Sequence, residues 1–271
     1  MMEPASGWIK AWTADVVESK AVLLDAGAPY ALGPEIALAW TGQVRVPLSG
    51  ALSAAEDGAW FFRSVSLLGG TPTAPNGDTC NSCHMEGAAN NIILNGHQVP
   101  AAWGSTQTTP NGWLGDTPTI QNLVLGALKV HNHTGVPAPD GAASLVLQFL
   151  TANLPPPSIY LDASGTLTPD QSAGKALFDG VAQCSQCHQA PLFIPPSGSP
   201  PTFPDGIGTG LVPANVPSLR GIWATAPYLH DGSAKTLMDV LTKNPLDAHG
   251  QRGGPLTPAQ RGQLVEYLKT L

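Results

Sequence analysis

The sequence predicts a mainly α-helical protein made of two tandem domains, with long loops and few short strands. Three observations lead to this expectation. The motif C-x-x-C-H occurs twice, at Cys80–His84 and at Cys184–His188. A stretch with helical spacing precedes each motif, and another follows it. The 30 glycines and 27 prolines among 271 residues predict many turns and loops between these helices.

The motif C-x-x-C-H is the attachment signal for c-type haem. Its two thiols can add across the two vinyl groups of one porphyrin, and the adjacent histidine then reaches the iron from the proximal side. A four-cysteine zinc site is the alternative, but zinc needs no histidine directly after both pairs. The motifs therefore predict two covalent haems c, with His84 and His188 as proximal iron ligands. They use every cysteine of the chain: Cys80, Cys83, Cys184 and Cys187.

Composition limits the classes of partner. Charged residues are only 11% of the chain, against about 25% in an average soluble domain. The net charge of -7 argues against a nucleic-acid or anionic-membrane partner and suits a small redox protein as electron donor or acceptor. No run of eighteen apolar residues occurs, so a membrane span is not expected.

The start of the chain shows no basic stretch followed by an apolar core, as a signal peptide would. Attachment of c-type haem normally follows export. We therefore expect the sequence to be a mature, trimmed or fragmentary form of a periplasmic or extracellular protein. Residues 1–52 are interpreted as an N-terminal extension or the tail of an upstream module, with short strands at 21–25 and 43–47.

The first haem domain is expected to span residues 53–155. Ser53 and Glu56 form a capping-box pattern that opens a short helix through Phe62, ahead of the first motif. Helical spacing over residues 140–153 predicts a second helix. The three prolines of 155–157 stop that helix and form a stiff linker.

The second haem domain is expected to span residues 156–271. Thr168 opens a helix ahead of the second motif, and Thr257 with Pro258 opens the last helix. We expect the helix before each motif to cross the helix at the end of its domain, as in a cytochrome c-like unit. Four apolar residues share one face of the last helix: Leu264, Val265, Leu268 and Leu271.

Further landmarks of a repeat follow each motif. Residues 116–122 resemble 216–221, and 131–135 resemble 229–232. The offsets of the matched cysteine, proline and glycine are 104, 99 and 97 residues. Three landmarks in one order predict two homologous haem domains.

The segment Val216–Ser233, VPSLRGIWATAPYLHDGS, followed by Thr236–Leu241, resembles the bacterial di-haem cytochrome c peroxidase family, which includes the MauG enzymes. The resemblance covers about residues 53–271 and is most specific in the second domain. It implies a mostly α fold, two covalent haems and a calcium ion between the domains. In that family one haem collects electrons and the other reacts with peroxide.

The resemblance also implies roles for single residues. His97 lies thirteen residues beyond His84, like the histidine of the family's mobile loop, which caps the peroxidatic haem at rest. The alternative for His97 is a solvent-facing loop histidine. Asp116, Thr225 and Pro227 fall where the family binds calcium, the last two through backbone carbonyls, although Asp replaces the usual Asn.

The distal ligand of the second haem departs from the family pattern. Where the family has Met or Tyr, this chain has Asn244. His249, Met238 and His230 are the remaining candidates, and His249 is favoured. Histidine in place of methionine lowers the haem potential. Met238 is expected to pack in the core, and His230 to hydrogen-bond within its loop.

The first domain departs further. Where the family has a W-D-G tryptophan between the haems, the matched segment offers His131 and His133 as residues near the haem–haem path or as distal ligands. Trp103 or Trp113 could then relay electrons. Between Glu86 and Glu266 no glutamate occurs, so the acid that protonates peroxide would be a histidine, Asp140 or water.

Three functions follow from these expectations. The first is reduction of hydrogen peroxide, or its use to oxidise a substrate, at the N-terminal haem, with electrons passing through the C-terminal haem. The second is a non-enzymatic electron carrier in which both haems are six-coordinate. The third is a di-haem oxygenase. An iron that can lose its distal ligand favours catalysis, and two permanently capped irons favour electron transfer alone.

Overall fold

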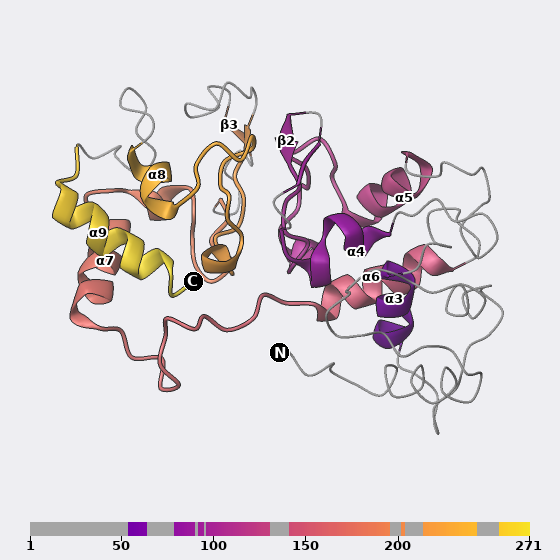
Figure 1. Ribbon diagram of the computed structural model, residues 1–271, viewed down its shortest axis with the longest axis horizontal. Helices are drawn as coiled ribbons and strands as arrows, with labels where there is room; N and C mark the ends of the chain where they lie inside the picture. The colour runs from indigo at the N-terminus through magenta and orange to yellow at the C-terminus, as the bar shows by residue number, and fades with distance from the viewer. Residues whose placement is uncertain are drawn as a thin grey trace. The chain divides into compact units, whose positions relative to one another are not determined.

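A computed structural model describes residues 54–63, 79–89, 92–94, 96–130, 141–195, 202–203, 214–242 and 255–271. The described chain is mainly helical, with long connections and two very short hairpins (Figure 1). This confirms the predicted fold class. The strands expected within residues 1–52 lie outside the described residues. The α-helices are α3 (Ala54–Phe62), α4 (Cys80–Cys83), α5 (Ile120–Val130), α6 (Ala142–Ala152), α7 (Pro169–Asp179), α8 (Leu237–Thr242) and α9 (Pro258–Leu268).

The hairpins are each made of two antiparallel two-residue strands. In the first, Leu94 pairs with His97, and Gly96 in the turn has a φ of 80°, which favours glycine. Neither hairpin was expected from the sequence, because strands this short carry no periodicity. Their bounds are β1 (Ile93–Leu94) with β2 (His97–Gln98), and β3 (Thr202–Phe203) with β4 (Ala214–Asn215).

The chain forms two compact units. The first holds the described residues up to Ser82 together with Gln121–Ala152, and the second holds Cys83–Ile120 and Asn153–Leu271. The first C-x-x-C-H motif is therefore shared, because Cys80 belongs to the first unit and Cys83 to the second. The expected division of the haem domains into 53–155 and 156–271 stays a prediction.

In the first unit, α3 packs across α6 (Figure 1). The helices approach so closely at Gly58 that a Cβ atom there would lie 1.9 Å from the carbonyl oxygen of Leu145. One turn later, Phe62 is 3% exposed and its ring centroid lies 4.9 Å from that of Phe149. The predicted crossing of the helix before the motif and the helix after it is therefore confirmed in this half.

In the second unit, α7 packs across α9 in the same way. A Cβ atom on Gly174 would lie 2.0 Å from the carbonyl oxygen of Gln263. Phe178, one turn later, meets Tyr267 edge to face at 5.4 Å. The predicted N-caps are confirmed: α7 and α9 both open with complete capping boxes. The buried core around this crossing contains Phe178, Ala182, Leu219, Leu237, Leu241, Leu256, Leu264, Tyr267 and Leu268.

The segments that follow the motifs repeat as well, but in a different register from the predicted one. The 3-10 turns Ser105–Gln107 and Ile222–Ala224 each follow a left-handed glycine, and they lie 117 residues apart. Isolated β-bridges close the next loops at the same offset, Asn111 to Thr117 and Tyr228 to Ala234. Helices α5 and α8 then begin at Ile120 and Leu237, again 117 residues apart.

This register corrects the sequence comparison. It pairs residues 99–104 with 216–221 and residues 108–115 with 225–232. The predicted pairings of 116–122 with 216–221 and of 131–135 with 229–232 are therefore both wrong. The sequence comparison relied on proline and glycine identities, whereas the repeat has kept its backbone shape and changed most side chains. Trp113 is thus the counterpart of His230. The segment Trp113–Gly115 is likewise the counterpart of His230–Gly232.

Candidate functional site

The first motif is a single helical turn. In α4 the two cysteines stand three residues apart, which places them on one side of the turn. Thr79, which precedes this turn, and Ser82, which lies within it, bond reciprocally. The Ser82 backbone amide donates to Thr79 Oγ1 at 3.0 Å, and the Thr79 backbone amide donates to Ser82 Oγ at 3.1 Å. The local sequence therefore presents both thiols of Cys80 and Cys83 to one ligand.

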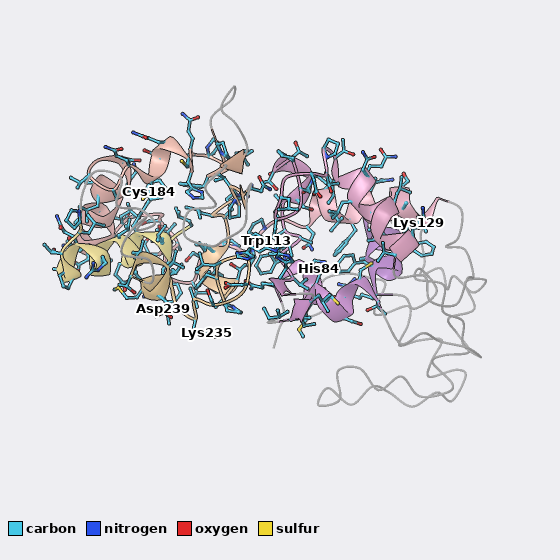
Figure 2. All side chains as sticks on the ribbon, turned by 90° about the horizontal axis from the view of Figure 1, so that it is seen from above. His84, Trp113, Lys129, Cys184, Lys235 and Asp239 are labelled. Carbon is cyan, nitrogen blue, oxygen red and sulfur yellow. The ribbon has the colours of Figure 1, made fainter. Side chains whose placement is uncertain are left out.

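The histidine of this motif is oriented by the backbone. His84 Nδ1 lies 2.9 Å from the carbonyl oxygen of Pro100. Because a carbonyl oxygen only accepts hydrogen bonds, Nδ1 carries the proton, and Nε2 is the nitrogen whose lone pair can bind iron. His84 is labelled in Figure 2.

The second motif has the same arrangement in a different setting. The first cysteine of the pair begins the 3-10 turn Cys184–Gln186, and Cys187 directly follows that turn. His188 is only 6% exposed, and its Nδ1 lies 3.2 Å from the carbonyl oxygen of Phe193. Each motif histidine thus presents Nε2 for coordination, as a proximal haem ligand must.

The thiol of Cys184 packs against the apolar core of the second unit. Burial raises its pKa to about 12, and a hydrogen bond with its own backbone opposes this. Reactive redox dithiols have lowered pKa values, because the thiolate is the nucleophile. The raised pKa of Cys184 therefore argues against a reactive redox dithiol at this motif.

His97 is half-buried on β2 and lies against His230, with 5.4 Å between ring centroids. Both expectations for His97, a haem ligand and a solvent-facing loop histidine, stay predictions. The Nδ1 atoms of both rings are buried and have no hydrogen-bond partner among the described residues. Among the described residues, the hydrogen bond expected for His230 within its loop is not made through Nδ1. Burial lowers the pKa of His230, the Asp231 carboxylate opposes this, and the neighbouring His97 adds to the lowering.

Backbone and side-chain bonds hold the hairpin of His97 to the loop of His230. The backbone amide of Gln98 donates to the carbonyl oxygen of His230 at 2.6 Å. Trp113 Nε1 donates to the carbonyl oxygen of Gln98 at 2.7 Å, and its ring meets that of His230 edge-on at 6.4 Å. Gln98 itself is only 4% exposed.

The second repeat makes an equivalent bond. The backbone amide of Asn215 donates to the carbonyl oxygen of Trp113 at 2.8 Å. At the offset of 117 residues, Asn215 is the counterpart of Gln98, and Trp113 is the counterpart of His230. Equivalent positions of the two repeats are therefore joined by reciprocal backbone hydrogen bonds. We call the set Gln98, Trp113, Asn215 and His230 the clasp.

The calcium site expected at Asp116, Thr225 and Pro227 stays a prediction. Asp116 is exposed, and its Oδ1 accepts from the Thr117 hydroxyl at 3.4 Å. The side chain that reaches the carbonyl oxygen of Thr225 is Gln98, whose Nε2 donates at 3.4 Å. The described residues also contain no cluster of three or more His, Cys, Asp or Glu side chains that could hold a metal ion.

The other predicted residues have varied settings. Met238 is half-buried on α8, whose buried residues are Leu237 and Leu241. Trp103 Nε1 donates to the carbonyl oxygen of Glu86 at 2.9 Å, so this ring supports the segment just after the first motif. Asn153 Nδ2 donates to the same oxygen at 3.1 Å. His131, His133 and His249 lie outside the described residues.

Gln98 and Asn215 were missed by the sequence analysis. A signal existed, because each precedes a Val-Pro pair, Val99-Pro100 and Val216-Pro217, at the offset of 117 residues.

Where the chain is described, no helix combines the length and the apolar character that a membrane span requires.

Comparisons with known proteins agree with this fold. The RoxA-like, cytochrome c-like family model matches residues 215–245. The hydrazine synthase subunit gamma of Kuenenia stuttgartiensis is 29% identical over 157 residues, which are 42% of this chain and 44% of that protein. The alignment thus spans less than half of that curated relative.

Three solved structures have a similar fold at low sequence identity. Hydrazine synthase from Kuenenia stuttgartiensis has a TM-score of 0.63 at 22% identity, over 93% of this chain and 96% of that one. A MauG-like protein associated with microbial copper homeostasis has a TM-score of 0.62 at 20% identity, over 84% and 91%. The diheme peroxidase BthA from Burkholderia thailandensis has a TM-score of 0.54 at 15% identity, over 83% and 87%. The chain therefore has the cytochrome c-like fold of these structures, which is the fold that the family resemblance implied.

Proposed function

We propose that this chain is an exported di-haem c-type cytochrome that passes electrons between two covalent haems and reduces hydrogen peroxide at the first. One observation carries the proposal. Both C-x-x-C-H histidines have Nδ1 bonded to a backbone carbonyl, of Pro100 and of Phe193, so both present Nε2 for an iron. Two such sites with no other cysteine in the chain support two haems c.

The residues present fit the haem groups. Four thiols would form the thioether bonds, and His84 and His188 would bind the irons through Nε2. When bound, the haems would supply one-electron redox chemistry and an iron that can react with peroxide. The carbonyls of Pro100 and Phe193 fix the imidazole planes, and their hydrogen bonds raise the basicity of the proximal nitrogens.

His97 supports catalysis at the first haem. A distal histidine that leaves on activation must be held by contacts that do not fix its ligating nitrogens. His97 meets this condition, because its Nδ1 has no hydrogen-bond partner among the described residues and its ring packs on His230. Reduction of peroxide to two waters also consumes two protons. No glutamate occurs in this part of the chain. The imidazole of His97 is therefore assigned the role of proton donor to the leaving oxygen of peroxide.

Trp113 supports transfer between the haems. It occupies the repeat position of the W-D-G tryptophan, and its indole is fixed by its bond to the carbonyl oxygen of Gln98. Its edge-on contact with His230 joins the two repeats through aromatic rings. We assign Trp113, rather than Trp103, the relay role, because Trp103 supports the Glu86 segment.

The electron partner is proposed to be a small redox protein outside the cytoplasm. The net charge of -7 favours a partner with a positively charged contact surface. Such association would weaken as ionic strength rises, because salt screens exposed charges.

Peroxide titration of the half-reduced protein tests the function. We expect the electrons of the protein to be consumed by peroxide and the first-haem spectrum to change. His97→Ala should convert the first haem to the high-spin form, while the control Met238→Leu should leave it unchanged. A half-reduced protein that neither consumes peroxide nor shows a five-coordinate haem would overturn the peroxidase proposal in favour of a pure electron carrier. An unchanged spectrum in the His97 variant would shift the ligand role to His131 or His133.

A further inference from the structure

Between the two clasp residues of each repeat lies a 3-10 turn, Ser105–Gln107 in the first repeat and Ile222–Ala224 in the second. Three side chains on these turns have a buried nitrogen or oxygen atom without a hydrogen-bond partner among the described residues: Ser105 Oγ, Thr106 Oγ1 and Trp223 Nε1. Thr106 and Trp223 are counterparts at the offset of 117 residues. The same position in both repeats therefore carries a buried donor that no described protein atom satisfies.

Such donors need an acceptor. An unsatisfied buried hydroxyl or N–H group costs about 1–3 kcal/mol, and buried polar groups in proteins are nearly always paired. The indole of Trp223 can only donate, so its partner is an acceptor, and the hydroxyl of Thr106 can donate to the same kind of group. The ring of Trp223 packs against that of Tyr160 in a T-shaped contact, with 6.1 Å between the ring centroids. An acceptor that recurs once in each repeat would satisfy both positions.

In the first repeat, the turn directly follows the segment that holds the motif. The carbonyl oxygen of Pro100 fixes the imidazole of His84, and the backbone amide of Ala102 donates to the carbonyl oxygen of Gly87 at 2.7 Å. Thr106 comes four residues after Ala102. Its hydroxyl therefore lies on a segment that is bonded to the histidine of the first motif and to the residues just after it.

In the second repeat, the corresponding segment is fixed beside the second motif. Ser218 Oγ donates to the carbonyl oxygen of Leu192 at 2.6 Å, within the loop that follows the motif. Ile222, the neighbour of Trp223, packs against the same apolar core as Cys184. The turn and the first cysteine of the motif thus border one core.

Haem c offers an acceptor that recurs once in each repeat. Its carboxylates are the two propionates, on the porphyrin edge remote from the vinyl positions where the motif cysteines attach. An ionised carboxylate only accepts hydrogen bonds, and hydrogen bonds to a charged acceptor are the stronger ones. Donors for the propionates must therefore come from segments outside the motif, as the two turns do.

We propose that Thr106 and Trp223 each donate a hydrogen bond to a propionate of the haem in their own repeat, with Ser105 as a second donor in the first. Both are positioning residues: each would fix its porphyrin at the propionate edge, while the cysteines fix the opposite edge. The proposal rests on the two haems of the proposed function and does not depend on whether peroxide is turned over.

Resonance Raman spectroscopy of the haem-loaded full chain tests the proposal, because the frequency of the propionate bending band follows the hydrogen bonds that the propionate accepts. Trp223→Phe keeps an aromatic ring against Tyr160 and removes the N–H group, so this band should shift. The midpoint potential of one haem should also fall at a pH where its propionates are ionised, because a less compensated negative charge stabilises ferric iron. Trp223→His retains an N–H donor and should return the band toward its native frequency.

Trp103→Phe is the matched control for the indole. The Nε1 atom of Trp103 already donates to the carbonyl oxygen of Glu86, so its loss should leave the propionate band unchanged. A shift in this control equal to that of Trp223→Phe would contradict the assignment, because removal of any indole would then suffice.

Thr106→Val tests the first repeat in the same way, and Thr106→Ser should keep the native band. Thr270→Val is the control, because Thr270 Oγ1 already donates to the carbonyl oxygen of Tyr267 at 2.7 Å. The shifts of Trp223→Phe and Thr106→Val should add in the combined variant, because they concern different haems. If Trp223→Phe does not fold, the series at Thr106 decides alone.

The haem content of each protein, measured on the reduced pyridine adduct, separates failure of this inference from failure of the proposed function. A native protein without two haems would refute the proposed function. Two haems per chain with an unchanged propionate band in Trp223→Phe or in Thr106→Val would overturn the inference, and water would then be the partner of the buried donor.

Discussion

The two helix crossings of this protein are built alike, while the two haem motifs beside them are set differently. In each crossing, a glycine allows close contact and a phenylalanine one turn later packs on an aromatic ring: Gly58 and Phe62, then Gly174 and Phe178. The second motif lies wholly within one unit, with His188 buried. The first is divided between two units, with His84 half-buried. The repeat thus conserves the crossing and varies the surroundings of the haem.

This difference suits a division of labour. A motif enclosed in one core suits a haem whose ligation stays constant during electron transfer. A half-buried motif histidine, with the hairpin of His97 nearby in sequence, suits a haem whose distal side must change. The contrast supports the assignment of peroxide chemistry to the first haem.

The largest expected effect tests whether the crossings are equivalent. Gly58→Ala and Gly174→Ala should each lower the free energy of unfolding by about 3 kcal/mol, because the new methyl group would overlap a backbone carbonyl of the facing helix. Chemical denaturation measures both. A costly change at Gly174 with a neutral change at Gly58 would break the equivalence.

Matched controls exist in both halves. Gly126 in α5 and Gly262 in α9 have open space where a Cβ atom would stand. Alanine at either position should raise stability by up to about 1 kcal/mol, because alanine is the better helix former. The sign of the effect therefore separates glycines needed for packing from those that are not.

A smaller effect is expected at the helix caps of the second half. Thr168 and Thr257 each accept from the backbone amide three residues on, and each box is completed by a glutamine. Thr168→Ala and Thr257→Ala should each cost about 1 kcal/mol. Serine at the same positions keeps the acceptor and should restore most of the loss. Full stability in the alanine variants would show that packing at the crossing, and not capping, sets these helix starts.

The sequence was sufficient for features with local signals. The capping pattern at Thr168, the Thr257-Pro258 start and the crossing helices α3, α6, α7 and α9 were predicted, because caps and helical spacing depend on neighbouring residues. Helix α5 was not predicted. The register of the repeat was not, because left-handed glycines and bridges preserve shape while side chains change. The contact of His97 with His230 joins residues far apart in sequence, and no sequence pattern predicts it. The roles of His131, His133 and His249 stay predictions.

The central claim is that this chain holds two covalent haems c, one at each C-x-x-C-H motif. The absorbance of the reduced pyridine adduct, scaled to protein concentration, tests it most directly. We expect two c-type haems per chain in the native protein and one in each double variant, Cys80→Ala with Cys83→Ala or Cys184→Ala with Cys187→Ala. A native protein with one haem or none would contradict the account.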